Sequence, residues 1–242
     1  MNVRKRNFAL VVIIFTFVAV NRQGLCRQCP WADDYFPLKK GNSWTYSALV
    51  DWTVPDSAGE VQHDEITWDC EVVDIFCKGN ILAARLRGFL YDLTWYEKGK
   101  AAGDYIVIRV GASHYHLISD KVEDFWRKVT ATEGYSSIDE LGADNLLLEV
   151  PLIVGETYGE FADTPRGSYC WNVTKESSLD VSSIAGVGQN QLWKEFSVRF
   201  QTGPDHTVIG FTPGLGITHF EYGHHGTVAN CRARLVQFHT GG

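Results

Sequence analysis

The chain has 242 residues, a formal charge of -7 and a hydrophobic content of 45 %, which is the composition of a globular protein and excludes a disordered one. The acidic balance argues against nucleic acid or an anionic membrane surface as a partner, because both require a basic footprint. The length is sufficient for one large β domain or for two small domains.

The N-terminus has the pattern of an export signal. Arg4, Lys5 and Arg6 precede an apolar run from Phe8 to Val20, and this run is shorter than the ~20 residues that a membrane-spanning helix needs. We therefore expect residues 1–25 to be removed as a signal peptide and the mature protein to be secreted or periplasmic. A lipid anchor at Cys26 is the less favoured alternative, because the residues before Cys26 depart from the usual lipoprotein pattern.

Alternation of apolar and polar residues with a period of two dominates the first half of the chain. Trp44, Tyr46 and Ala48 fall on one face of a predicted strand, and Ser47 falls on the other. The alternation changes phase near Val72, which predicts a bulge. Short glycine-containing turns between consecutive strands indicate antiparallel pairing. The strands predicted after the first one are 65–77, Ile81–Arg87, Phe89–Glu97, Tyr105–Val110 and His114–Ile118.

The middle of the chain differs from the rest. Asp120 and Glu123 can form a capping box, apolar residues follow at helical spacing, and Ser137 with Glu140 can open a second helix. The sequence therefore predicts one helical insert over Ser119–Leu148, and a polar loop over 177–191 later in the chain. The strands predicted after the insert are Tyr169–Val173, Leu192–Phe200, Thr207–Phe211, Ile217–Tyr222 and Val228–His239.

An eight-residue pattern occurs twice. Residues 37–44 read PLKKGNSW and residues 151–158 read PLIVGETY. Proline fixes φ and glycine permits a sharp bend, so each copy predicts a turn that places an aromatic residue at the start of a strand. We expect a first β half at 26–148, containing the helical insert, and a second at 149–242, or one continuous domain. The predicted fold class is mainly β, an antiparallel barrel, half-barrel or sandwich with a short helical insert.

Six cysteines in an exported chain favour disulfides. Cys26 and Cys29 form a C-x-x-C motif outside any βαβ context, which favours a structural disulfide over a redox or zinc site. Cys70 and Cys77 share one extended segment, about 23 Å apart, and cannot pair unless the chain turns between them. The sequence therefore predicts that their partners come from Cys170 and Cys231. All six are disulfide candidates: Cys26, Cys29, Cys70, Cys77, Cys170 and Cys231.

The histidines are the weak candidates for a metal site. His114 and His116 alternate along a predicted strand, so both rings point to one face, and His224 and His225 lie near a predicted turn. Zinc or copper could be bound if the two pairs met. Separate structural roles for the pairs are favoured, and no cofactor is predicted. The alternative function is a metal-dependent hydrolase that uses these histidines.

Eight tryptophans in an exported β protein suggest carbohydrate binding, but the same residues also suit a hydrophobic core. An apolar ligand inside a barrel or half-barrel would use them as well. The chain has no G-x-S-x-G, P-loop or G-x-G-x-x-G motif, and no residue is marked as catalytic. We therefore expect non-catalytic binding of an apolar or carbohydrate ligand, or of an envelope partner, by a mature chain without a transmembrane helix.

Two short segments carry a resemblance. Residues 35–46 (YFPLKKGNSWTY) and 211–217 (FTPGLGI) resemble segments of a broad group of uncharacterised exported bacterial proteins and lipoproteins. The resemblance implies a β-rich envelope or secreted protein and supplies no activity or functional residue. A looser similarity, in β content and export alone, is to periplasmic lipid-carrier half-barrels.

Overall fold

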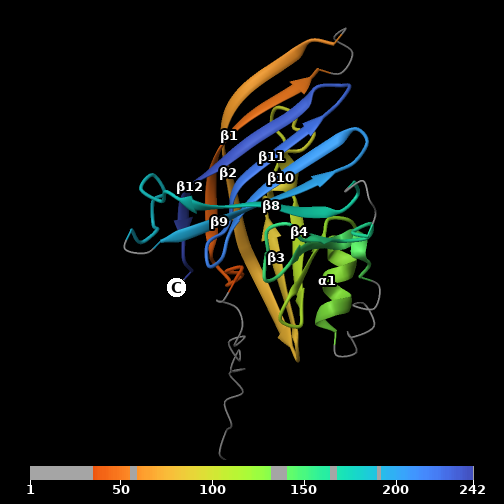
Figure 1. Ribbon diagram of the computed structural model, residues 1–242, viewed down its shortest axis with the longest axis vertical. Coiled ribbons are helices and arrows are strands. Elements are labelled where there is room, and N and C mark those ends of the chain that lie inside the picture. Colours follow the sequence, from red (N-terminus) through yellow and green to blue (C-terminus); the bar gives the residue numbers. More distant parts are fainter. Residues whose placement is uncertain (1–34, 55–58, 132–140, 164–167, 190–191, 242) are drawn as a thin grey trace, which may run out of the picture.

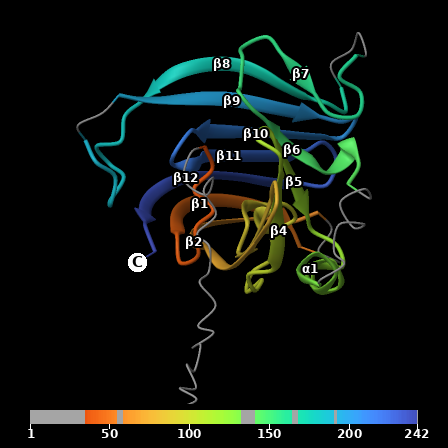
Figure 2. The same ribbon diagram turned by 90° about the horizontal axis from the view of Figure 1, so that it is seen from below.

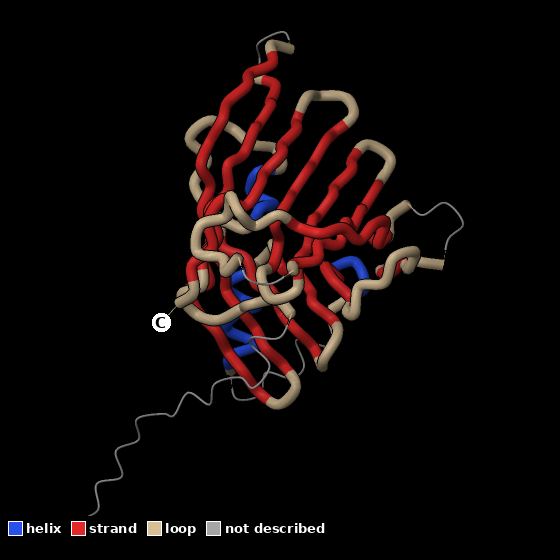
Figure 3. Tube along the Cα trace, turned by 60° about the vertical axis from the view of Figure 1, so that its left-hand side comes forward, coloured by secondary structure: helices blue, strands red, loops and turns tan. Residues whose placement is uncertain are grey.

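The computed structural model describes residues 35–54, 59–131, 141–163, 168–189 and 192–241. Strands account for most of this part of the chain (Figure 3), so the mainly β prediction is confirmed. The strands are β1 (Ser43–Thr53), β2 (Val61–Lys78), β3 (Ile81–Arg87), β4 (Asp104–Val110), β5 (His114–Ile118), β6 (Leu146–Glu149), β7 (Thr157–Tyr158), β8 (Trp171–Leu179), β9 (Trp193–Gln201), β10 (Asp205–Thr212), β11 (Gly216–His224) and β12 (Ala229–His239). The helical elements are α1 (Val122–Thr130) and the short 3-10 turns η1 (Leu90–Leu93) and η2 (Ala143–Asn145).

The twelve strands belong to one sheet in the order β6-β5-β4-β3-β2-β1-β12-β11-β10-β9-β8-β7. Neighbouring strands pair antiparallel, and β1 joins the first half of the chain to its last strand by pairing with both β2 and β12 (Figure 1). The predicted bulge near Val72 is confirmed by a register shift between Val72 and Asp74 in the β2–β3 pair. The predicted boundary after residue 148 falls inside β6.

The sheet curls into a nearly closed barrel (Figure 2). Its two ends, β6 on one side and β7 with β8 on the other, are joined by side chains. The Trp171 indole N–H donates to the Leu146 carbonyl at 2.8 Å, and the Tyr158 hydroxyl donates to the Leu147 carbonyl at 3.1 Å. These bonds satisfy carbonyls that a strand at the sheet edge would otherwise leave unpaired.

Alternating residues of the strands fill the barrel. The inward face of β1 is buried at Trp44, Tyr46, Ala48, Val50 and Trp52, as the alternation predicts. A cavity among the largest core side chains measures about 10 Å³, roughly the space of one water molecule. The barrel is therefore packed by its own side chains, as small barrels are.

The segment predicted as a strand over Phe89–Glu97 is not a strand, so that prediction is wrong. Gly88, at φ 75°, turns the chain into the end of the barrel, where η1 and its flanks bury Phe89, Leu90 and Leu93. We call residues 88–103 the plug. Apolar residues in this segment face the core from a loop, and their pattern resembles that of a half-buried strand.

The single α-helix of the described residues, α1, lies on the outer face of β3, β4 and β5 (Figure 2). Its Val129 packs with Ile106 and Ile108, whose neighbour Val107 points into the barrel. Within the predicted insert over Ser119–Leu148, the residues that the structure describes are helical at α1 and η2, and the last ones form strand β6. The predicted second helix start at Ser137 and Glu140 lies outside the described residues. No described helix is long and apolar enough to cross a membrane.

The two segments that carry the resemblance meet in the structure. The Gly214 N–H donates to the Tyr35 carbonyl at 2.7 Å, and the Trp44 indole donates to the Leu215 carbonyl at 2.7 Å. The rings of Tyr35 and Phe211 stack with centroids 5.5 Å apart. The opening and closing segments therefore form one packed unit of the barrel.

The repeated eight-residue pattern makes the same local structure twice. Gly41 and Gly155 both have positive φ, at 84° and 95°. The Gly41 N–H donates to the Val72 carbonyl and the Val72 N–H to the Asn42 carbonyl; the second copy repeats this exchange with Gly155, Val173 and Glu156. In each copy the turn feeds a buried aromatic into a strand, as the sequence predicts.

Candidate functional site

The seam of the barrel contains a cleft of about 380 Å³. We call it the seam cleft. It lies between the plug, the β4–β5–β6 side and the β8–β9 side, where the two ends of the sheet approach without backbone pairing. Its lining residues are Tyr91, Thr94, Tyr105, Leu117, Ser119, Asp144, Asn145, Leu146, Leu147, Trp171 and Phe200. Its volume lies within the range of small-molecule sites, about 300–1,000 Å³.

Four aromatic side chains line the seam cleft. Trp171 and Phe200 face each other across β8 and β9, with ring centroids 5.1 Å apart. The hydroxyl of Tyr105 donates to Asp92 Oδ1 at 2.9 Å, and the Trp171 indole is bound to Leu146. Burial raises the pKa of Tyr91 and of Tyr105 above the usual value, so both phenols are neutral at physiological pH. Because the polar groups of Trp171 and Tyr105 already have partners inside the protein, the surface that these rings turn to the cleft is apolar; that of Trp171 is small, since its side chain is buried.

Polar groups stand at the edge of the same cleft. Asp144 and Asn145 belong to η2, Ser119 follows β5, and Thr94 belongs to the plug. Asp144 and Ser119 are exposed, and the backbone of η2 is held by the Asn145 N–H donating to the Gly142 carbonyl at 3.2 Å. The cleft thus combines ring faces with carboxylate, amide and hydroxyl groups that can bind hydroxyls of a ligand.

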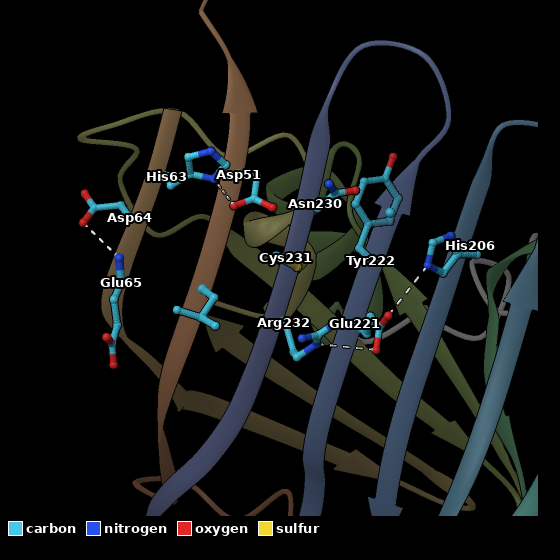
Figure 4. A pocket seen from close by; sticks show the side chains of 12 residues that line it. Asp51, His63, Asp64, Glu65, His206, Glu221, Tyr222, Asn230, Cys231 and Arg232 are labelled. Atoms are coloured by element: carbon cyan, nitrogen blue, oxygen red, sulfur yellow. Dashed lines mark hydrogen bonds and ion pairs between the residues drawn. The ribbon is translucent and has the colours of Figure 1, made fainter. Parts of the chain in front are cut away.

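A second hollow lies on the outer face of β2, β1, β12, β11 and β10, with a volume of about 620 Å³ (Figure 4). We call it the outer-face groove. His63 is hydrogen-bonded to Asp51 at 2.7 Å, and Glu221 Oε2 lies 3.8 Å from Arg232 Nε. Glu221 also lies 3.9 Å from His206 Nε2. Asp51, Glu221 and Arg232 therefore already have partners within this groove, and a ligand would have to displace those pairs. This makes it the weaker candidate site.

The structure does not bring the two predicted histidine pairs together. His114 and His116 lie on β5, and the sheet places β4, β3, β2, β1 and β12 between them and β11. His114 Nε2 lies 3.7 Å from Glu149, whereas His224 Nδ1 is 2.6 Å from Asp205. Burial lowers the pKa of His116, with a further contribution from His114.

The His225 ring lies 5.8 Å from that of His206. Among the residues that the structure describes, no group of three or more His, Cys, Asp and Glu side chains could hold a metal ion. Each of the four candidate histidines therefore has its own local surroundings, and no observation supports the hydrolase alternative.

The cysteines depart from the predicted pairing. Cys70, Cys170 and Cys231 are buried free thiols. Cys77 is disulfide-bonded, although not to these three. Cys70 and Cys77 lie on the single strand β2, as expected. The prediction that their partners are Cys170 and Cys231 is wrong, because both of these are free thiols. Strand β1 lies between Cys70 on β2 and Cys231 on β12. Cys26 and Cys29 lie outside the described residues.

Sequence reasoning missed the seam cleft. Its aromatic residues come from the plug, β4, β8 and β9, and no local pattern links Tyr91 or Tyr105 to Trp171 and Phe200. A partial signal was present: Trp171 begins a strand that follows the second copy of the repeated pattern.

The comparisons with known proteins show similarity at the level of solved structures. No protein-family model and no curated protein matches the chain. A presumed exported protein with a YmcC-like fold from Bacteroides fragilis is similar with a TM-score of 0.43 and 11 % identity, over 86 % of this chain and 100 % of that one. A presumed lipoprotein from Parabacteroides distasonis is similar with a TM-score of 0.41 and 10 % identity, over 86 % of this chain and 99 % of that one.

Proposed function

We propose that this chain is an exported, non-catalytic protein that binds a carbohydrate in the seam cleft. Export is supported by the basic and apolar N-terminal segment, Arg4 to Val20. Carbohydrate binding is supported by one observation above all. The seam cleft is lined both by the aromatic residues Tyr91, Tyr105, Trp171 and Phe200 and by the polar residues Thr94, Ser119, Asp144 and Asn145.

A sugar suits both kinds of surface. The C–H face of a pyranose ring is apolar and packs on aromatic rings, which combine a large contact area with a polar edge. Its hydroxyls need donors and acceptors at the periphery, where the carboxylate of Asp144 and the amide of Asn145 can supply them. Asp144 is exposed and Asn145 half-buried, so a ligand can reach these polar groups, whereas Trp171 is 5 % exposed and contributes little of its surface to the cleft.

A purely apolar ligand is less well supported. The barrel core has a cavity of only about 10 Å³, so an acyl chain cannot lie in it without repacking. The seam cleft could shelter apolar groups, but it would place them against the Asp144 carboxylate. Burying an ion beside an apolar group is unfavourable.

Calorimetric titration of the purified mature protein tests the proposal. The probes are cellohexaose, maltohexaose and chitohexaose, with palmitate representing an apolar ligand. At least one hexasaccharide is expected to bind, and Asn145→Ala is expected to weaken it about 2–10-fold through loss of a hydrogen bond. The matched control is Asn80→Ala, an exposed asparagine on the β2–β3 turn that does not line the cleft.

The proposal fails if none of the three hexasaccharides binds. It also fails if a hexasaccharide binds but Asn145→Ala and Asn80→Ala behave alike. Binding of palmitate alone would support the apolar ligand instead.

A further inference from the structure

Trp95 is held in an unusual conformation at the end of the barrel. Its side chain is 49 % exposed, and its backbone has φ 53°, in the left-handed region that bulky residues rarely occupy. An exposed indole is not stabilised by burial, and the left-handed backbone conformation is itself unfavourable for a residue with a side chain. Strain of this kind is concentrated at functional sites in proteins.

A network of side chains fixes the indole in place. The ring of Trp95 packs against His224 with centroids 4.6 Å apart, and Trp95 hydrogen-bonds to Tyr222. Asp205 Oδ1 accepts hydrogen bonds from the Tyr222 hydroxyl at 2.8 Å and from His224 Nδ1 at 2.6 Å. Burial favours the neutral form of Asp205, but the hydrogen bonds from His224 and Tyr222 lower its pKa below the usual value. The plug is thereby fastened to β10 and β11 through the indole.

The indole lies along the same wall as the seam cleft. Trp95 directly follows Thr94, which lines the cleft. Trp171, Phe200, Thr207 and Tyr222 are partners in register across β8, β9, β10 and β11. Thr207 and Tyr222 are buried, so this row sets the position of Trp95 relative to the cleft from within the barrel wall. With strands ~4.8 Å apart, Tyr222 stands roughly 10 Å from Phe200.

We propose that Trp95 is a second carbohydrate subsite next to the seam cleft, so that the ligand is a linear oligosaccharide extending from the cleft to the indole. This inference rests on the proposed function and adds the length of the ligand. His224 supports one side of the ring and the exposed part of the indole receives a sugar face. The ring is immobilised before the ligand arrives, which reduces the entropy lost on binding.

The test compares ligand length in two variants. Cellobiose and cellohexaose, maltose and maltohexaose, and chitobiose and chitohexaose are titrated into the wild type, Trp95→Ala and Trp95→Phe. Trp95→Ala should weaken the affinity for the hexasaccharide about 3–10-fold, which is the contribution of one aromatic contact. The affinity for the disaccharide should not change. Trp95→Phe keeps an aromatic face and should recover most of the loss.

Trp193→Ala is the matched control. Trp193 is a partly exposed tryptophan at the far end of the β8–β9 pair, where it is paired with Leu179. The Trp193→Ala variant should bind the disaccharide and the hexasaccharide with wild-type affinity. In nitrogen-15-labelled protein, the indole N–H signal that disappears in Trp95→Phe should shift with the hexasaccharide but not with the disaccharide.

The outcomes separate the two proposals. If Trp95→Ala weakens the affinities for the hexasaccharide and the disaccharide equally, Trp95 only supports the cleft. The subsite is then refuted, while the proposed function stands. An unchanged hexasaccharide affinity in Trp95→Ala also refutes the subsite alone. Failure of every saccharide to bind the wild type refutes both.

Discussion

At the residue scale, two side chains do what backbone pairing does elsewhere in the sheet. Tyr158 and Trp171 donate to the carbonyls of Leu147 and Leu146 across the seam. Both donors are buried, and an unpaired carbonyl in such a place costs free energy comparable to a lost hydrogen bond. The same two bonds hold one wall of the seam cleft, because Leu146, Leu147 and Trp171 all line it.

Tyr158→Phe should lower the free energy of unfolding by about 1–3 kcal/mol, because it removes only the hydroxyl and leaves the Leu147 carbonyl without its partner. Urea unfolding followed by circular dichroism measures this. The matched control is Tyr169→Phe at a half-exposed tyrosine, which should change the unfolding free energy by less than ~0.5 kcal/mol. Equal effects of the two substitutions would show that the seam bond contributes nothing.

At the element scale, the plug decides how the barrel ends. Gly88 begins it, with the Trp68 indole donating to the Gly88 carbonyl at 2.9 Å. Asp92 stabilises it from inside by accepting from the Gly103 N–H at 2.7 Å and from the Tyr105 hydroxyl. The plug therefore connects the core to the aromatic wall of the seam cleft, and its position sets the place of Tyr91, Thr94 and Trp95.

Gly88→Ala and Gly99→Ala separate backbone conformation from space within the plug. Both glycines have positive φ, at 75° and 85°, but a Cβ at Gly88 would lie 2.1 Å from the Asp69 carbonyl oxygen, whereas one at Gly99 meets nothing within 4 Å. Gly99→Ala should cost about 1–2 kcal/mol of unfolding free energy from backbone conformation alone. Gly88→Ala should cost clearly more, because β2 or β3 must shift. The prediction is contradicted if thermal and urea unfolding show equal losses.

At the scale of the whole molecule, the barrel encloses three cysteines as thiols. Cys70, Cys170 and Cys231 are almost completely buried, and burial raises the pKa of the Cys231 thiol to about 12 and that of Cys70 well above its usual value. Thiolate is the reactive form of cysteine. Cys70 and Cys231 are therefore protected from modification both because reagents cannot reach them and because they stay protonated. These thiols behave as small core residues and give the sheet no cross-link.

Labelling with N-ethylmaleimide at mildly alkaline pH, read by peptide mass spectrometry, should leave Cys70, Cys170 and Cys231 unmodified in the folded protein. All three should be modified in guanidinium chloride. Cys77 should be modified only when a reductant is also present, because it is disulfide-bonded. Rapid labelling of the folded protein at any of the three buried thiols would contradict the packed barrel.

The sequence by itself determined the strands whose faces alternate. The inward residues of β1, the bulge near Val72 and the two repeated turns all follow from local pattern, because side-chain direction along a strand and the freedom of glycine are local properties. Only the tertiary structure decided the plug, the free thiols and the seam cleft. Phe89–Leu93 has the polarity of a half-buried strand, and the pattern cannot tell a core-facing loop from a strand. Tyr91, Trp171 and Phe200 meet because the curled sheet brings its ends together, and curvature and closure depend on packing between residues far apart in the chain.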